Sequence, residues 1–240
     1  MLSVRDNSHT AMNGSAHVYG PSHLAWLAGI AGTSIAVSFL LRRGLLRQQY
    51  VRAVLVCLLI GTQAYRFRGG MDFPHHLPFQ ICNLTAWVAV IACLGLYPVA
   101  VEFTYFAGLA GAGMTLLTPD MGSDLLFFVQ HGVLIVAASA LVFGRIAPLR
   151  EGAMWRAYGC SVLYLAFVGV FDWATGANYA YLRKKPGAAT LLSVIGQWPY
   201  YIFGMMALGL LIYWLLWLPV RPGSRKREPI RVGAHSEASA

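Results

Sequence analysis

The chain alternates long apolar stretches with short polar connections. Apolar runs of about 20 residues are typical of helices that cross a lipid bilayer. We therefore predict an all-α polytopic membrane protein with seven transmembrane helices in one bundle. The predicted spans are Ser22 to Leu41, Tyr50 to Tyr65, Leu77 to Tyr97, Val99 to Leu117, Asp124 to Phe143, Trp155 to Trp173 and Trp198 to Leu218.

These spans divide the chain into a flexible N-terminal segment (1–21), a transmembrane domain (22–218) and a disordered basic tail (219–240). Composition agrees, because 58% of the 240 residues are hydrophobic and only 11% are charged. Soluble domains carry about 25% charged residues. Residues 1–21 lack a basic stretch followed by an apolar one, so no cleavable signal peptide is expected.

The net charge of +9 lies mainly in short blocks between the spans, which favours membrane orientation over nucleic-acid binding. One side of the predicted membrane holds twelve cations: Arg42, Arg43, Arg47, Arg52, Arg145, Arg150, Arg156, Arg221, Arg225, Lys226, Arg227 and Arg231. The other side holds six: Arg5, Arg66, Arg68, Arg183, Lys184 and Lys185. The positive-inside rule then places the N-terminus outside and the C-terminus in the cytoplasm.

Two side chains in separate spans are candidates for chemistry. Cys82 lies five residues into the third span, about one turn inside the helix, between the polar residues Gln80 and Asn83. His131 lies seven residues into the fifth span, and we interpret it as the only intramembrane histidine. Both spans start from the outer face, so the two residues lie roughly 8 and 10 Å below it, at matching depth.

A buried thiol is inert unless a base within hydrogen-bond reach takes its proton. His131 is placed to be that base, and Gln80 or Asn83 to stabilise an oxyanion. A second interpretation stays open: Cys82 as a small apolar filler, like Cys57, Cys93 and Cys160, and His131 as a helix–helix hydrogen-bonding residue.

Further polar residues lie near the outer ends of the spans: Asp120, Asp124, Asp172, Asn178 and Arg183. They either orient His131 and receive a lipid headgroup, or are solvated loop residues. Glu102 starts the fourth span on the cytoplasmic side, where it pairs with an arginine or reaches the interface.

A metal site is a weaker interpretation. Zinc hydrolases built on seven spans need several intramembrane histidines, and here His75 and His76 fall just outside the third span. We therefore expect no metal and no other cofactor.

Several sequence stretches resemble, in order, the bacterial YwaF-like integral membrane proteins and the family that includes animal transmembrane protein 164. The matching stretches are Leu77 to Leu84, Glu102 to Leu109, Leu117 to Asp120, Phe127 to Gly132, Asn178 to Pro186 and Gly196 to Tyr200. The resemblance implies a bacterial plasma-membrane protein that moves an acyl chain through a thioester on Cys82, with His131 as the base. Gln80, often a histidine in that family, and Gln197 depart from its pattern.

The resulting hypothesis is an intramembrane acyltransferase or hydrolase acting on phospholipids or other acyl lipids. Neither a nucleic acid nor a particular protein partner is predicted. Two alternatives come from other classes: a small-solute or lipid transporter or channel that uses the intramembrane His131 and Glu102, and a non-catalytic membrane scaffold.

Overall fold

The chain folds into helices throughout the part that the computed structural model describes, which comprises residues 19–70, 73–74, 77–118, 125–185 and 195–221. The all-α prediction is confirmed for these ranges. The α-helices are α2 (Pro21–Arg42), α3 (Gln48–Arg66), α4 (Ile81–Gly95), α5 (Pro98–Ala107), α6 (Gly113–Leu117), α7 (Leu125–Val142), α8 (Ala153–Thr175) and α9 (Tyr200–Trp217).

Five helical segments in the described ranges are long and apolar enough to cross a membrane: Pro21–Arg42, Pro98–Leu117, Leu125–Val142, Ala153–Thr175 and Tyr200–Val220. The protein is therefore an integral membrane protein. Each predicted span overlaps a helix or helical segment, but α4 has only 15 residues. Helix α3 is long enough and carries Gln48, Gln49, Arg52, Gln63 and Arg66, which lower its apolar character.

The third helix begins later than predicted. Pro78 disfavours helical backbone at the residue before it, and Gln80 is extended, with ψ of 140°. A contact with a distant residue fixes the segment 77–80 instead, since the Leu77 backbone N–H donates to the Tyr179 hydroxyl (2.7 Å). Helix α4 thus starts at Ile81, and Cys82 is its second residue rather than one turn inside.

The fourth predicted span is interrupted. A π-helical segment, Gly108–Ala112, joins α5 to α6. A Cβ added to Gly108 would lie 3.6 Å from Thr85 of α4 and 3.7 Å from Ala138 of α7. The small residues therefore form a close helix–helix seam, as the sequence predicts. The break in helical geometry has no hydropathy signal, and π turns occur frequently at functional sites.

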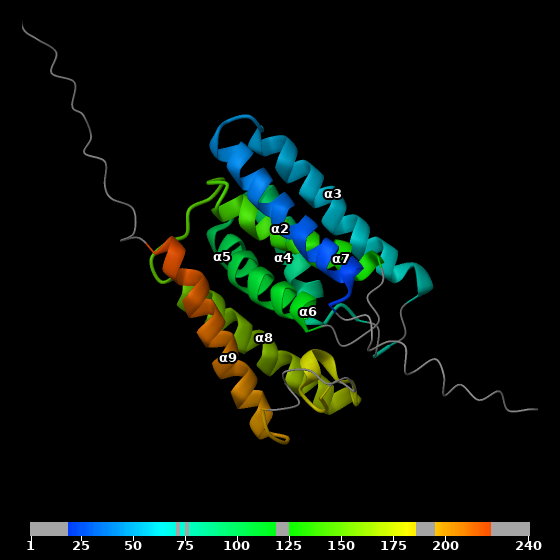
Figure 1. Ribbon diagram of the computed structural model, residues 1–240. Coiled ribbons are helices and arrows are strands. Elements are labelled where there is room, and N and C mark those ends of the chain that lie inside the picture. The colour runs from blue at the N-terminus through cyan, green and yellow to red at the C-terminus, as the bar shows by residue number, and fades with distance from the viewer. Residues whose placement is uncertain (1–18, 71–72, 75–76, 119–124, 186–194, 222–240) are drawn as a thin grey trace, which may run out of the picture.

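The helices form one group from α2 to α7, with α8 and α9 lying along one side of it (Figure 1). Helices α4 and α7 each contribute fully buried alanines to the core, including Ala86 and Ala89 of α4 and Ala137 and Ala140 of α7. Small side chains let helix backbones approach closely where lipid supplies no hydrophobic driving force. By contrast, only Tyr201 and Tyr213 of α9 are buried, as expected of a helix that faces lipid along much of its surface.

A buried ion cluster joins α5 to the start of α8. Glu102 is 1% exposed and accepts hydrogen bonds from both Arg150 (2.9 and 3.2 Å) and Arg156 (2.9 and 2.8 Å). Both arginine side chains remain partly exposed at 47% and 38%. The expected pairing of Glu102 with a connection arginine is confirmed, and its carboxylate is fully engaged.

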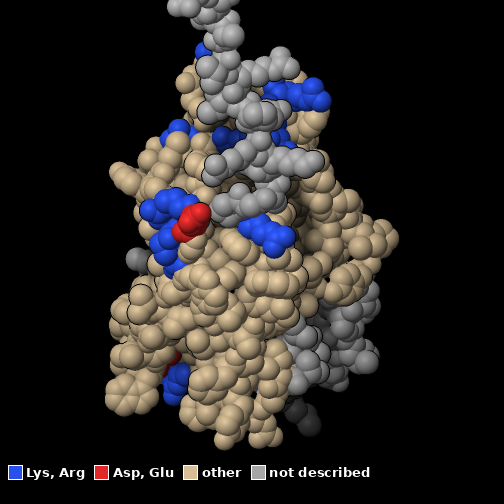
Figure 2. Space-filling view, turned by 90° about the vertical axis from the view of Figure 1, so that its left-hand side faces the viewer, with Lys and Arg blue, Asp and Glu red and all other residues tan. Residues whose placement is uncertain are grey.

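The same end of the molecule gathers other cations. Figure 2 looks onto the side where the α2–α3 and α7–α8 connections lie, and Lys and Arg side chains cluster on its upper part. One of them, Arg52, donates to the backbone carbonyls of Cys93 and, at 2.6 Å, Leu94. A cation there also interacts favourably with the C-terminal end of α4.

We predict that Glu102→Gln destabilises the fold, because it leaves two guanidinium groups beside a neutral amide. Thermal unfolding in detergent should show a midpoint lowered by about 5 °C or more. Arg150→Gln should cost less, since Arg156 still neutralises Glu102. The matched control is Glu151→Gln at an exposed position; equal effects of the two glutamate substitutions would contradict a structural role for the cluster.

Candidate functional site

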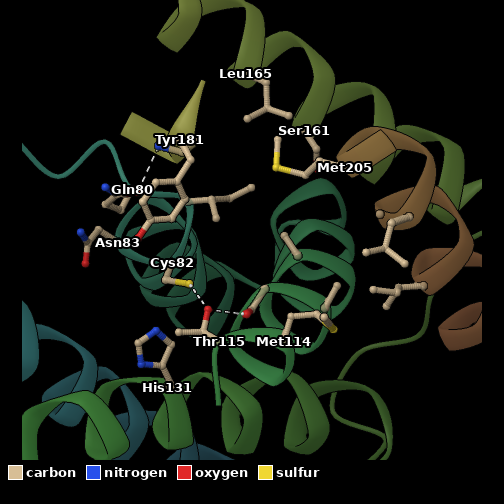
Figure 3. Close-up of a pocket in the computed structure, with 18 of the residues that line it drawn as sticks. Gln80, Cys82, Asn83, Met114, Thr115, His131, Ser161, Leu165, Tyr181 and Met205 are labelled. Carbon is tan, nitrogen blue, oxygen red and sulfur yellow. Dashed lines mark hydrogen bonds between the residues drawn. The ribbon is translucent and has the colours of Figure 1, made fainter. Parts of the chain in front are cut away.

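A cavity of about 590 Å³ lies between the α2–α7 group and the α8–α9 pair. Its walls come from α4, the π-helical segment, α6, α7, α8, α9 and the segment that follows α8. Gln80, Cys82, Thr115 and His131 lie toward one side of it, and Leu165, Ser161 and Met205 toward the other (Figure 3). This volume is in the usual range for a small-molecule site.

Cys82 lies at the N-terminal end of α4. Its sulfur is 3.9 Å from the Thr115 hydroxyl, which itself donates to the Gly111 carbonyl at 2.9 Å. A Cβ added to Gly111 would lie 3.8 Å from the same sulfur. The π-helical segment thus approaches the thiol closely. The positive end of the α4 dipole favours negative charge at this position.

His131 projects from α7 and points toward the Cys82 side of the cavity (Figure 3). Its Nδ1 lies 2.7 Å from the Phe127 carbonyl oxygen. Because a carbonyl only accepts, Nδ1 carries the proton in this contact, which makes Nε2 the basic nitrogen of the neutral ring. The ring is 8% exposed and packs on Phe127 with centroids 4.7 Å apart.

The residues next to this pair connect the two helices. Gln130 donates a hydrogen bond to the Asn83 side-chain oxygen at 2.7 Å. Asn83 follows Cys82 in α4, and Gln130 precedes His131 in α7, so one contact fixes the relative position of both. In this bond the side-chain oxygen of Asn83 is the acceptor, and the NH₂ group of the same amide is its hydrogen-bond donor.

Gln80 both lines the cavity and makes a structural hydrogen bond. Its side-chain oxygen accepts a hydrogen bond from the Ala180 backbone N–H at 3.1 Å. The N-terminal end of α4 is thereby tied to the segment after α8. Gln80 also lines the cavity, so it is positioned both to hold this segment and to contact a bound molecule.

The segment 177–185 contributes Ala180 and Tyr181 to the cavity lining, and Tyr181 was not predicted from the sequence. Ala180 and Tyr181 both have left-handed backbone, with φ of 50° and 56°, which costs energy for residues other than glycine. With this conformation Tyr181 lines the cavity together with Gln80, Asn83 and Cys82 (Figure 3). No sequence signal marks the left-handed pair, although the Tyr-rich composition of the segment hints at packing.

Tyr179 anchors this segment to the residues before α4. Its hydroxyl donates to the Pro74 carbonyl (2.7 Å) and accepts from the Leu77 N–H. Burial raises the pKa of the Tyr179 hydroxyl above its ordinary value, so the proton needed for the bond to Pro74 is retained at neutral pH.

Two other candidates have structural contacts. Asn178 accepts from the backbone N–H groups of Arg183 (2.9 Å) and Lys184 (3.0 Å), which closes the turn. The Arg183 guanidinium donates to the Asp172 carbonyl at 3.4 Å. Neither Asn178 nor Arg183 lines the cavity. Asp120 lies outside the described residues, as do Asp124, His75 and His76.

Comparison with known protein families decides the identity. Residues 18–218 match the sequence profile of the TMEM164 family. The chain belongs to the TMEM164 family. The predicted resemblance to the transmembrane protein 164 family is thus confirmed. No curated protein and no solved structure matches the chain.

In this member of the TMEM164 family, His131 is not the only helical histidine, and that interpretation was wrong. His23 lies in the first turn of α2, fully buried, with Nε2 2.9 Å from the Leu116 carbonyl at the end of α6. Tyr19 stacks on the His23 ring and its hydroxyl donates to the Leu117 carbonyl. His23 does not line the cavity, so it serves the end of α6.

Within the described ranges, no three His, Cys, Asp or Glu side chains lie close enough together to hold a metal ion. His75 and His76, which the metal interpretation considered, lie outside those ranges.

We predict that a bulky residue at Gly111 shields Cys82 from reagents. In Gly111→Leu the new side chain starts within 4 Å of the sulfur, so labelling of Cys82 by N-ethylmaleimide should slow at least about tenfold through steric blocking. Mass spectrometry of the Cys82 peptide measures the rate. Gly113→Leu is the matched control, because a Cβ at Gly113 meets nothing within 4 Å. Equal slowing in both variants would contradict the geometry.

Proposed function

We propose that this TMEM164-family protein is an intramembrane acyl-lipid acyltransferase or hydrolase, with Cys82 as the nucleophile and His131 as its base. The observation that carries the proposal is the placement of both side chains on one wall of a largely apolar cavity (Figure 3). The contact from His131 Nδ1 to the Phe127 carbonyl adds to it, because it leaves Nε2 as the base.

The reaction would proceed in two steps. The Cys82 sulfur attacks the carbonyl carbon of an acyl ester, its proton passes to His131 Nε2, and the ester C–O bond breaks. His131 returns that proton to the departing alcohol, leaving an acyl thioester on Cys82. Water or the hydroxyl of a second lipid then attacks the thioester, His131 again moves the proton, and the thiol is restored.

Charge develops on the carbonyl oxygen during both attacks and needs donors. Asn83 and Gln80, which flank Cys82 in the sequence and line the cavity with it, are the candidate donors. Arg183 and Lys184, which follow the cavity-lining Tyr181 in the sequence, are exposed. They provide positive charge for a phosphate headgroup.

The same proposal places all seven helical segments across a plasma membrane, with α3 and the short α4 as full spans and the arginine-rich end in the cytoplasm. The cytoplasmic cations at this end include Arg52, Arg150 and Arg156, all in the described part of the chain. Cys82 and His131 would then react from the outer half of the bilayer.

The transporter alternative used Glu102 as a proton relay. Its four hydrogen bonds to Arg150 and Arg156 favour a fixed ion cluster instead. Proton-coupled flux in vesicles that depends on Glu102 but not on Cys82 would favour transport over acyl transfer, and lipid composition unchanged by deletion would favour a scaffold.

Covalent labelling tests the proposal directly. A phospholipid analogue with a thiol-reactive acyl ester should acylate wild-type protein at Cys82, and Cys82→Ser should abolish the label. Cys160→Ser is the matched control, because Cys160 is a partly buried cysteine that does not line the cavity. Labelling that survives Cys82→Ser, together with unchanged lipid turnover, would remove the proposal.

The role of the base has its own test. His131→Gln should lower the acylation rate about 10²–10⁴-fold, the usual contribution of a general base, while His23→Gln should leave the rate per folded molecule near wild type. A rate unchanged by His131→Gln in folded protein would mean that another group takes the thiol proton.

Orientation is tested with impermeant thiol labelling of intact cells. A cysteine introduced at Arg183 should react from outside, and one introduced at Arg150 should react only after the membrane is opened, because the positive-inside rule puts Arg150 in the cytoplasm. The reverse pattern would invert the topology.

A further inference from the structure

The apolar side of the cavity follows one face of α9. Met205, Gly209 and Tyr213 are spaced four residues apart and all line the cavity. Residues with this spacing share one helix face, and the stretch covers about 12 Å at the rise of an α-helix. Val162 and Leu165 of α8 form the adjacent wall, and Figure 3 shows Leu165 and Met205 across the cavity from His131.

This face extends away from the reactive end. Phe79, just before α4, accepts a hydrogen bond from Tyr164 of α8 at 2.8 Å, which sets the level of the α4 N-terminus along α8. Ser161 lies further from that level, toward the start of α8, and it lines the cavity as well. The cavity therefore continues from Cys82 along α8 and α9.

The far end of the apolar face is closed by a fixed side chain. The Ser161 hydroxyl donates to the Ala157 carbonyl (2.9 Å), so the Tyr213 hydroxyl donates to Ser161 (2.9 Å). The Tyr213 ring packs on Phe106, with centroids 5.3 Å apart. One turn above it, Gly209 leaves space, because a Cβ added there would meet no atom within 4 Å.

From these contacts we infer that this face of the cavity binds one acyl chain of the substrate. We call it the acyl slot: Gly209 leaves it wide enough for the acyl chain, and Tyr213 closes its far end. The inference rests on the proposed function, since the bound acyl chain is part of the ester that Cys82 attacks. A linear apolar slot, flexible methionines along it and a polar reactive end suit a fatty acyl ester. The slot thus selects acyl chain length.

Hydrolysis of p-nitrophenyl butyrate and p-nitrophenyl dodecanoate by the purified chain in nanodiscs measures the selection. Gly209→Leu fills the slot and should lower kcat/KM for dodecanoate relative to butyrate by about tenfold or more, since each methylene displaced from an apolar site is worth about fourfold. The ratio is taken within one preparation, so the folded fraction cancels. Gly159→Leu is the matched control, because Gly159 in α8 also has open space but does not line the cavity.

A second variant tests the slot in the opposite direction. Tyr213→Leu removes the closing ring and leaves Ser161 bonded to Ala157, so the rate with p-nitrophenyl hexadecanoate should rise relative to dodecanoate. If hydrolysis needs Cys82 but neither ratio moves, the slot is overturned and the proposed function stands. If Cys82→Ser hydrolyses both esters as fast as wild type, the proposed function fails, and the slot fails with it.

Discussion

The hydrogen bond between Gln130 and Asn83 is the contact on which the site depends. Buried amides must be paired when they leave water, and this pair joins α4 to α7 at the residues adjacent to Cys82 and His131. Small residues bring the same helices together, since Gly108 packs against Thr85 and Ala138. Backbone approach and amide pairing therefore act together to bring a thiol and an imidazole from different helices to one cavity wall.

The rest of the molecule holds this arrangement from its two ends. At the arginine-rich end, Glu102 joins α5 to α8 through Arg150 and Arg156. At the opposite end, Gln80 and Tyr179 join the residues before α4 to the segment after α8. Helices α8 and α9 otherwise stand beside the main group (Figure 1). The cavity lies in that space because both of its ends are fixed by polar contacts.

Hydropathy predicted the helical fold well because membrane helices are read from long apolar runs. The sequence predicted close helix packing at Gly108–Ala112 from its small residues but not the π-helical geometry, since hydropathy does not report backbone hydrogen-bond register. The start of α4 was misplaced because Leu77 and Phe79 are apolar but not helical, although Pro78 carried the relevant signal. Matching depth was the basis for pairing Cys82 with His131, and both side chains line the same cavity, while their catalytic roles stay a prediction.

Other parts of the site could not be predicted. Tyr181 enters the cavity because Ala180 and Tyr181 adopt left-handed backbone that distant contacts hold in place. Asn178 looked like a ligand-binding polar residue, yet its side chain closes a turn. His23 was overlooked at the edge of the first span, where its contact with Leu116 depends on where α6 ends.

The π-helical segment makes the site sensitive to insertions and deletions. Removing a residue from Gly108–Ala112 would restore regular helical geometry but turn everything after it by about 100°. Thr115 would swing away from the Cys82 sulfur, and the Leu116 carbonyl away from His23. Exchange among small side chains leaves this register intact, whereas an insertion or deletion destroys it. The geometry of the site therefore depends more on the number of residues in this stretch than on which small residues they are.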